Sequence, residues 1–224
     1  MATSGSSRSQ RPRRRSRVAW ASLALAIAAA SFGGEADFRP DRGWLPLFNG
    51  KDLAGWKAVG RFKSEWRAEN GVLANPVESD NLYTEKEFEN FQLHLEFKLP
   101  KGGNSGVFLR GCKEVQLADS FGKQKLSEED CGGIFGKIAP SVNAARPPGA
   151  WNALDITLVG RKITVVLNGK TTVDGRVVNG VTGGQINEDE DKPGPLMLQG
   201  DHSGVWFRNL WLKPLPATHA KGVR

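Results

Sequence analysis

The clearest strand in the sequence reads Phe91-Gln92-Leu93-His94-Leu95-Glu96-Phe97-Lys98-Leu99. Apolar residues occupy every second position, and polar or charged residues fill the positions between them. Successive side chains of a β-strand point to opposite faces, so one face of this stretch enters a core while the other stays polar. The stretch therefore predicts a strand of an antiparallel sheet with one buried face.

Short apolar or alternating runs of this kind recur from Trp44 to Leu215 and are separated by Gly, Asn and Asp. Asn70-Gly71 and Asn168-Gly169 are tight-turn signals, because both residue types tolerate positive φ. Many short strands joined by such turns indicate an all-β sandwich or barrel. The expected strands are Leu45–Phe48, Trp66–Glu69, Val72–Ala74, Phe91–Leu99, Gly106–Arg110, Glu114–Leu117, Leu154–Val159, Ile163–Leu167, Leu196–Gln199 and Val205–Lys213.

The first 36 residues differ from the rest in composition. They carry six Arg and one Glu, and an uncharged apolar run of 13 residues extends from Val18 to Ala30. Basic residues before a short apolar run are typical of a secretory signal peptide, here with cleavage near Ala30 or Ala36, and an uncleaved N-terminal anchor is the alternative. We expect a periplasmic or secreted protein with three parts: residues 1–36, a sandwich domain over 37–215, and a disordered tail over 216–224.

The net charge of +7 is concentrated in this N-terminal segment. Residues 37–224 hold 25 basic and 23 acidic side chains, a net charge of +2. Binding to nucleic acid needs basic side chains on the folded part, where phosphates would meet them. The composition therefore argues against a nucleic-acid partner, and any membrane contact would come only from an uncleaved N-terminal segment.

Cys112 and Cys131 are the only cysteines. Export would place them in an oxidising compartment where a disulfide persists, but the sequence leaves open whether they come within bonding distance. Two Cys and three scattered His lack the spacing of a zinc site.

Residues 101–119 contain the polar side chains most suited to chemistry. Two predicted strands in this stretch would place Val107, Leu109, Val115 and Leu117 toward a core and would gather a polar set on the other side. The members of this set are Arg110, Glu114, Gln116 and Asp119. Carboxylates, an amide and a guanidinium together suit either proton transfer or the binding of a polyhydroxylated ligand such as a sugar.

Each of these residues also has a structural interpretation. Arg110 and Glu114 can form a cross-strand ion pair, and Asn104 lies in a Gly-rich turn where Asn is favoured locally. Taken alone, His202 is an exposed loop residue. The Trp residues fit core or rim packing better than sugar platforms.

Several motifs in order resemble the 3-keto-disaccharide hydrolase domain family, over about residues 44–214. The motifs are Phe48-Asn49-Gly50-Lys51-Asp52-Leu53 with Gly55-Trp56, Gly102-Gly103-Asn104-Ser105-Gly106-Val107-Phe108, Glu114-Val115-Gln116, Trp151-Asn152, Leu167-Asn168-Gly169, and Leu198-Gln199-Gly200-Asp201-His202 with Val205-Trp206-Phe207-Arg208-Asn209. The resemblance implies a two-sheet antiparallel β-sandwich, a concanavalin A-like jelly roll, in an exported bacterial protein that acts on sugars oxidised at C3.

Cleavage of a 3-keto-glycoside needs a base near C2, a group that stabilises the enolate at C3, and an acid for the leaving oxygen. With the resemblance, Glu114 becomes the candidate base, Arg110 and Asn104 the candidates for oxyanion stabilisation or substrate positioning, and His202 the candidate acid. Gln116, Asp119 and Asp201 are the further candidates for substrate binding. A divalent metal held by Glu114, His202 and Asp201 would be the cofactor in a variant of this scheme.

Two other functions stay open at this point. The same sandwich serves lectins, so a carbohydrate-binding module without catalysis is the main alternative. A structural domain of the cell envelope is the third, and it would be favoured if Glu114, Arg110 and His202 lay on separate surfaces.

Overall fold

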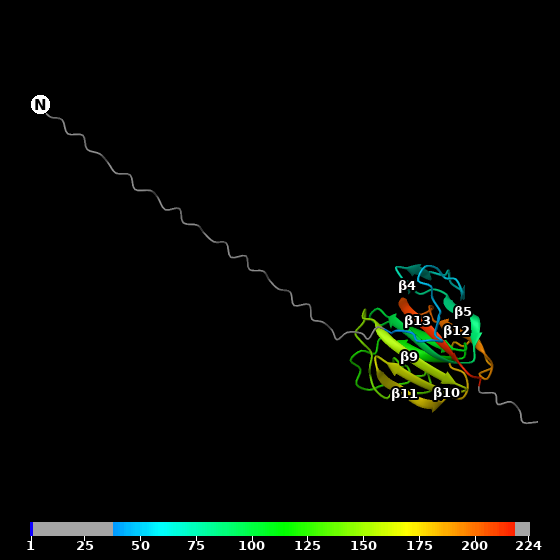
Figure 1. The fold of residues 1–224 in the computed structure, drawn as a ribbon. Helices are drawn as coiled ribbons and strands as arrows, with labels where there is room; N and C mark the ends of the chain where they lie inside the picture. The colour runs from blue at the N-terminus through cyan, green and yellow to red at the C-terminus, as the bar shows by residue number, and fades with distance from the viewer. Residues whose placement is uncertain (2–37, 218–224) are drawn as a thin grey trace, which may run out of the picture. The chain divides into compact units, whose positions relative to one another are not determined.

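A computed structural model describes Met1 and residues 38–217 of the chain, and the folded unit lies within Phe38–Arg224. The described residues form thirteen strands and no helix. The strands make two antiparallel sheets, which enclose a common apolar core (Figure 1). The predicted all-β class and two-sheet β-sandwich of jelly-roll type are confirmed.

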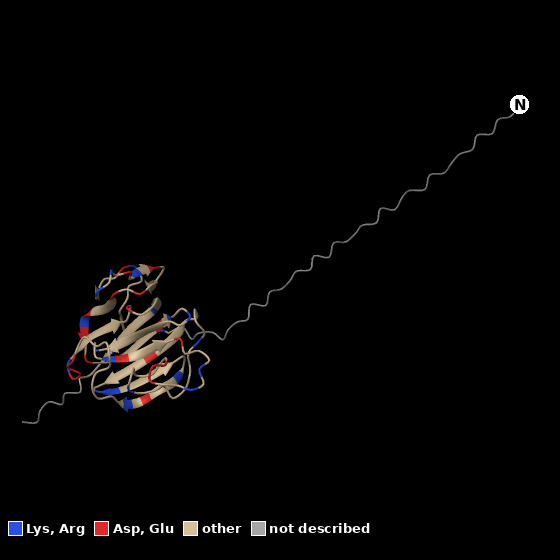
Figure 2. Cartoon of the chain, turned by 180° about the vertical axis from the view of Figure 1, so that it is seen from behind, with Lys and Arg blue, Asp and Glu red and all other residues tan. Residues whose placement is uncertain are grey.

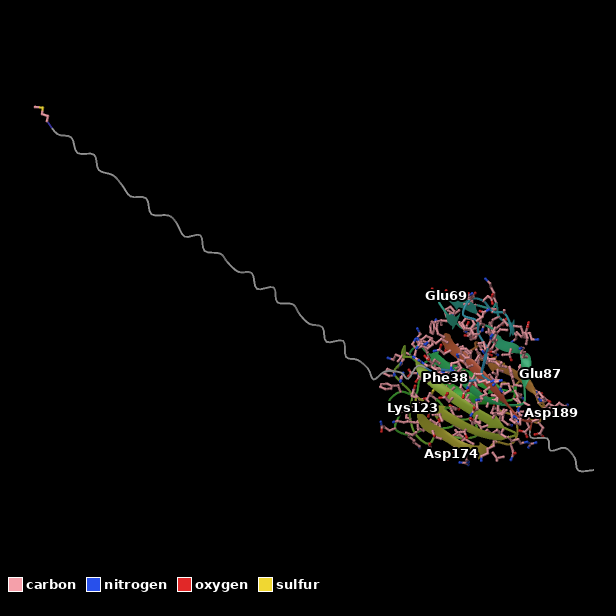
Figure 3. All side chains as sticks on the ribbon, viewed as in Figure 1. Phe38, Glu69, Glu87, Lys123, Asp174 and Asp189 are labelled. Carbon is pink, nitrogen blue, oxygen red and sulfur yellow. The ribbon has the colours of Figure 1, made fainter. Side chains whose placement is uncertain are left out.

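The larger sheet has eight strands, in the order β11-β10-β9-β6-β13-β4-β3, with β1 paired to β13. The bounds are β1 (Leu45–Pro46), β3 (Arg67–Glu69), β4 (Val72–Asn75), β6 (Asn90–Lys98), β9 (Asn152–Val159), β10 (Lys162–Leu167), β11 (Lys170–Val177) and β13 (Val205–Leu215). Figure 3 shows Glu69 of β3 and Asp174 of β11, on the two outermost strands, at opposite ends of the folded unit. The strand that the opening stretch predicts, β6, therefore lies in the middle of this sheet.

The smaller sheet has five strands, in the order β2-β5-β12-β7-β8. The bounds are β2 (Trp56–Val59), β5 (Asn81–Phe88), β7 (Asn104–Leu109), β8 (Lys113–Ala118) and β12 (Gly194–Leu198). Because β7 and β12 are separated by more than eighty residues, only the tertiary fold brings their outward-facing side chains together.

The buried residues of β7 and β8 follow the alternation expected of strands. Val107, Leu109, Val115 and Leu117 are all buried against apolar side chains of the larger sheet, so Glu114 and Gln116 stand on the opposite face of the smaller sheet. Lys, Arg, Asp and Glu are interspersed over the folded unit (Figure 2), in keeping with the small net charge of residues 37–224.

Three strands were missed by the sequence pattern, and each has a physical reason. β5 has Leu82 and Phe88 as its only large buried apolar residues and carries an irregular register opposite β12. β2 is a short strand at the sheet edge, and β11 is a mostly polar edge strand interrupted by Gly175. Edge strands bury few side chains, so their apolar signal is weak.

The two cysteines are both buried free thiols, so a disulfide between Cys112 and Cys131 is absent from the described fold. The expected N-terminal segment and most of the expected tail lie outside the described residues. No helix in the part of the chain that the structure describes has the length and apolar character to span a membrane.

Candidate functional site

A pocket of about 170 Å³ lies on the outward face of the smaller sheet. Its walls come from β7, β8, the turn after β12 and two loops. The lining residues are Asn104, Glu114, Gln116, Phe135, Gly183, Gly184, Gln199 and His202. Four of the seven candidate residues, Asn104, Glu114, Gln116 and His202, are thus brought together.

Glu114 lies at the bottom of this pocket and is 3% exposed. Its backbone is fixed on both sides, because its N–H donates to Thr182 Oγ1 (2.9 Å) and its carbonyl accepts from the Phe135 N–H (3.1 Å). Its side chain crosses the backbone of Gly106, where a Cβ atom would lie 2.1 Å from Glu114 Oε1. Gly106 is therefore needed to leave room for the carboxyl group.

Burial is the main reason that the pKa of Glu114 rises, to about 8, and the negative charge of Asp201 raises it further. No described residue donates a hydrogen bond to the carboxyl group that would offset this cost. The group therefore holds its proton through the neutral range and becomes a strong base once it ionises.

His202 forms the exposed wall of the pocket and is paired with Asp201. His202 Nδ1 lies 2.8 Å from Asp201 Oδ1, and Asn81 Nδ2 donates to the other carboxylate oxygen of Asp201 at 3.3 Å. Asn81 Oδ1 also accepts from the Gly200 N–H (2.8 Å), so β5 holds the turn that carries the pair. With Nδ1 engaged, Nε2 is the ring nitrogen left to exchange a proton with a ligand.

The turn with His202 is also tied to the strand with Asn104. Ser203 Oγ accepts from the Asn104 N–H (2.9 Å) and donates to the Asn104 carbonyl (2.8 Å). Asn104 Oδ1 in turn accepts from Gln116 Nε2 at 2.8 Å. A chain of hydrogen bonds therefore links the two sides of the pocket.

Two loops complete the pocket. Residues 132–138 run beside β8, where the Gly132 N–H donates to the Gln116 carbonyl (2.8 Å), and this pairing brings Phe135 to the rim. Residues 178–193 pass over Phe108, whose ring lies 3.2 Å from where a Cβ on Gly184 would be. Glycine at that position lets the loop approach the ring closely.

Arg110 does not belong to the pocket, contrary to the sequence prediction. It lies in the turn between β7 and β8 with φ of 54°, so strand alternation does not apply to it. Its side chain is buried and Nη2 donates to the Gly160 carbonyl, in the turn between β9 and β10. It neither pairs with Glu114 nor lines the site.

Asp119 was also expected at this patch, and the structure places it elsewhere. Five positions separate it from Glu114, and an odd separation along a strand places two side chains on opposite faces. Asp119 Oδ2 accepts from the Gly102 N–H (2.9 Å) and so closes the turn before β7. It has a structural role here.

The proposed metal ligands do not form a ready-made site. Among residues 38–217, no group of three or more His, Cys, Asp or Glu side chains is placed to hold a metal ion. The Asp201 carboxylate is engaged by Asn81 Nδ2 on one oxygen and by the His202 ring on the other.

Sequence reasoning missed Gln199, Phe135, Gly183 and Gly184. Gln199 had a usable signal, since Leu196 and Leu198 face the core and alternation places the next residue outward. Phe135 and the two glycines lie in loops, where no periodic pattern predicts the direction of a side chain.

The fold and the pocket define a jelly-roll protein with a polar site on the open face of its smaller sheet. The sequence model of the 3-keto-alpha-glucoside-1,2-lyase-like domain matches residues 43–213, and the chain belongs to this family. The resemblance noted from the motifs is confirmed.

A curated relative, named 3-keto-disaccharide hydrolase, from Bacteroides thetaiotaomicron is 34% identical over 95 residues, which is 38% of this chain. The match spans only 32% of that relative. Two solved structures of proposed glycosyl hydrolases from Parabacteroides distasonis are also similar. One is 30% identical with a TM-score of 0.65 and covers 78% of this chain and 84% of that chain. The other is 30% identical with a TM-score of 0.61 and covers 77% and 99%.

Proposed function

We propose that this protein cleaves the glycosidic bond of sugars oxidised to a ketone at C3. The name of the Bacteroides relative and the family of the chain support this substrate class. The observation that carries the proposal is the pocket itself, in which a buried carboxyl group faces a carboxylate–histidine pair. Such a pair of groups is suited to moving two protons in one reaction.

The ketone makes the reaction possible without an oxocarbenium ion. Ionised Glu114 takes the proton from C2, and the C2–H electron pair forms an enolate with the C3 oxygen. The enolate electrons then form the C1–C2 double bond as the C1–O bond breaks, and the leaving oxygen takes a proton from His202. Water adds to C1 of the resulting enone and C2 regains a proton, so the net reaction is hydrolysis.

Asp201 and Asn81 support this scheme by positioning His202, and Asn104 and Gln116 bind the sugar ring. Arg110 has no part in it, because its guanidinium is bound to the Gly160 carbonyl. Stabilisation of the enolate therefore falls to hydrogen-bond donors that line the pocket.

Export to the periplasm or the cell exterior is part of the proposal. It is supported by the Arg-rich start of the chain and the apolar run from Val18 to Ala30. Expression of the full chain in a bacterial host, followed by fractionation and N-terminal sequencing, tests it. A mature protein that starts near residue 31 or 37 in the periplasmic fraction is expected, and an uncut cytoplasmic chain would contradict export.

The test of function is incubation of the protein with a 3-keto-disaccharide and, separately, with its unoxidised parent, each with and without a chelator. We expect cleavage of the keto-sugar only. Glu114→Gln should lower turnover about 10²- to 10⁴-fold while binding persists, and Glu85→Gln, at an exposed position of β5, is the matched control. Failure to cleave either sugar under any metal condition would sink the proposal.

A further inference from the structure

Gln116 has a buried acceptor that no residue among 38–217 satisfies. Its side chain is 3% exposed, and Nε2 donates to Asn104 Oδ1 at 2.8 Å. Oε1, by contrast, has no hydrogen-bond partner among the described residues. A buried carbonyl oxygen without a donor is costly, so a native structure that keeps one at a pocket indicates a ligand that supplies the donor.

The hydrogen bond between the side-chain amides of Gln116 and Asn104 lies between two anchored stretches of backbone. The backbone of Gln116 is held by the N–H of Gly132 and the carbonyl of Gly133. The partner of its side chain, Asn104, is held at both backbone N–H and carbonyl by Ser203. The backbones that carry the two amides are therefore held in place before any ligand binds.

The position of this oxygen relates it to the proposed reaction centre. Glu114 and Gln116 are two residues apart on β8, so both side chains leave the same face, about 7 Å apart at their origins. A sugar ring whose C2 lies at Glu114 therefore has its other substituents within reach of Gln116.

We infer that Gln116 determines specificity by accepting a hydrogen bond from one hydroxyl group of the keto-sugar that is not oxidised. This inference rests on the proposed function. A hydroxyl group donates a hydrogen bond and a ketone oxygen only accepts one, so the ketone cannot occupy the place at Oε1. Gln116 thus orients the ring, and the substrate class is narrowed to 3-keto-sugars that retain this hydroxyl group.

Binding to the Glu114→Gln variant tests the inference without turnover. The ligands are a 3-keto-glucoside and its analogues in which the hydroxyl at C2, C4 or C6 is replaced by hydrogen or by fluorine. At one of these positions we expect both replacements to weaken binding about tenfold to a hundredfold. At that position the fluorine analogue should bind as weakly as the hydrogen analogue, because fluorine does not donate a hydrogen bond.

A second substitution assigns the effect to Gln116. Gln116→Met, added to the same variant, should bind the parent keto-sugar more weakly and bind the sensitive analogues as well as the parent. Gln92→Met, on the outer face of β6, makes the same change away from the pocket and should leave the discrimination intact. Gln116→Glu keeps an acceptor at nearly the same place and should keep the discrimination, and the analogue series in the Glu114→Gln variant still tests the inference if the Met variant does not fold.

The outcomes separate this inference from the proposed function. Binding of all analogues within about twofold of the parent, or discrimination that persists in the Gln116→Met variant, would overturn the role of Gln116 even if wild-type protein cleaves the keto-sugar. Discrimination without any cleavage by the wild-type protein would support the role of Gln116 and overturn the proposed function. If no keto-sugar binds, both fail.

Discussion

At the scale of single residues, the proton affinity of Glu114 decides what the site can do. To act as a base, the carboxyl group of Glu114 must be ionised. Because its pKa is about 8, the ionised fraction increases about tenfold with each unit of increasing pH until pH approaches 8. Because the mechanism needs an ionised Glu114 and a proton on His202 together, we expect kcat/KM for a 3-keto-glycoside to follow a bell-shaped pH profile in which Glu114 sets the break near pH 8. Steady-state kinetics from pH 5.5 to 9.5 measure this, and a profile without a break near pH 8 would contradict the role of Glu114 as the base.

The same pKa predicts a pH-dependent stability. Between about pH 4.5 and 8 the folded protein keeps a proton on Glu114 that the unfolded chain has released, so stability falls as pH rises through this window. The full effect is on the order of 5 kcal/mol. Glu114→Gln removes this pH dependence. In urea unfolding, the free energy of unfolding of the variant relative to that of the wild type should therefore increase from pH 5 to 8.5. Glu85→Gln should show no such trend, and equal curves for both variants would contradict the burial of an ionisable Glu114.

The absence of a side chain at Gly106 leads to a prediction about the position of the Glu114 carboxyl group. A Cβ at this position would meet the Cγ and the carboxyl group of Glu114, so Gly106→Ala should displace that side chain and leave the sheet intact. We expect a loss of turnover of about tenfold or more with little change in the circular dichroism spectrum. Unchanged turnover would show that the carboxyl group does not need to lie over Gly106.

At the scale of elements, the loop of residues 178–193 forms one wall of the pocket and is anchored by charge. Lys113, which is 1% exposed, donates to the Gly180 carbonyl and pairs with Glu190 of this loop. The acidic run Glu188–Asp191 thus has one member, Glu190, paired with a buried lysine. Because Gly183 and Gly184 lie on the same loop, this anchor contributes to the shape of the pocket.

Substitutions at Glu190 and Asp191 compare the contribution of the buried pair Lys113–Glu190 with that of the exposed pair Arg161–Asp191. Glu190→Gln leaves the buried Lys113 charge without a counter-charge, also removes a half-exposed pair with Arg161, and should destabilise the protein by about 3 kcal/mol. Asp191→Asn breaks a pair with Arg161 that is open to solvent and should change stability very little. Chemical denaturation of both variants measures the difference, and equal destabilisation would show that burial of Lys113 does not matter.

At the scale of the whole molecule, the free cysteines bear on how the fold is held together. Burial raises the pKa of Cys131 to about 12 and also raises that of Cys112, so neither thiol is reactive in the folded protein. We expect iodoacetamide to label neither cysteine in the native protein and both after unfolding without reductant. Mass spectrometry counts the labels, and an unlabelled unfolded protein would reveal a disulfide.

The sequence by itself determined the sandwich and the faces of its central strands. Alternation in β6, β7 and β8 fixed which side chains enter the core, because burial of apolar area is a local consequence of the period of two. It also placed Glu114 and Gln116 together, since both lie on one strand. The same rule, applied consistently, would have placed Asp119 on the other face.

Only the tertiary structure decided the composition of the pocket. His202 and Gln199 reach Glu114 because β12 pairs with β7, and a register between strands so distant in sequence is set by the packing of the whole sheet. Arg110 lies outside the site because its own backbone has a positive φ in the turn after β7, which redirects its side chain. Strand alternation cannot predict such a change. The raised pKa of Glu114 likewise arises from burial by loops that carry no periodic signal, so it belongs to the folded molecule alone.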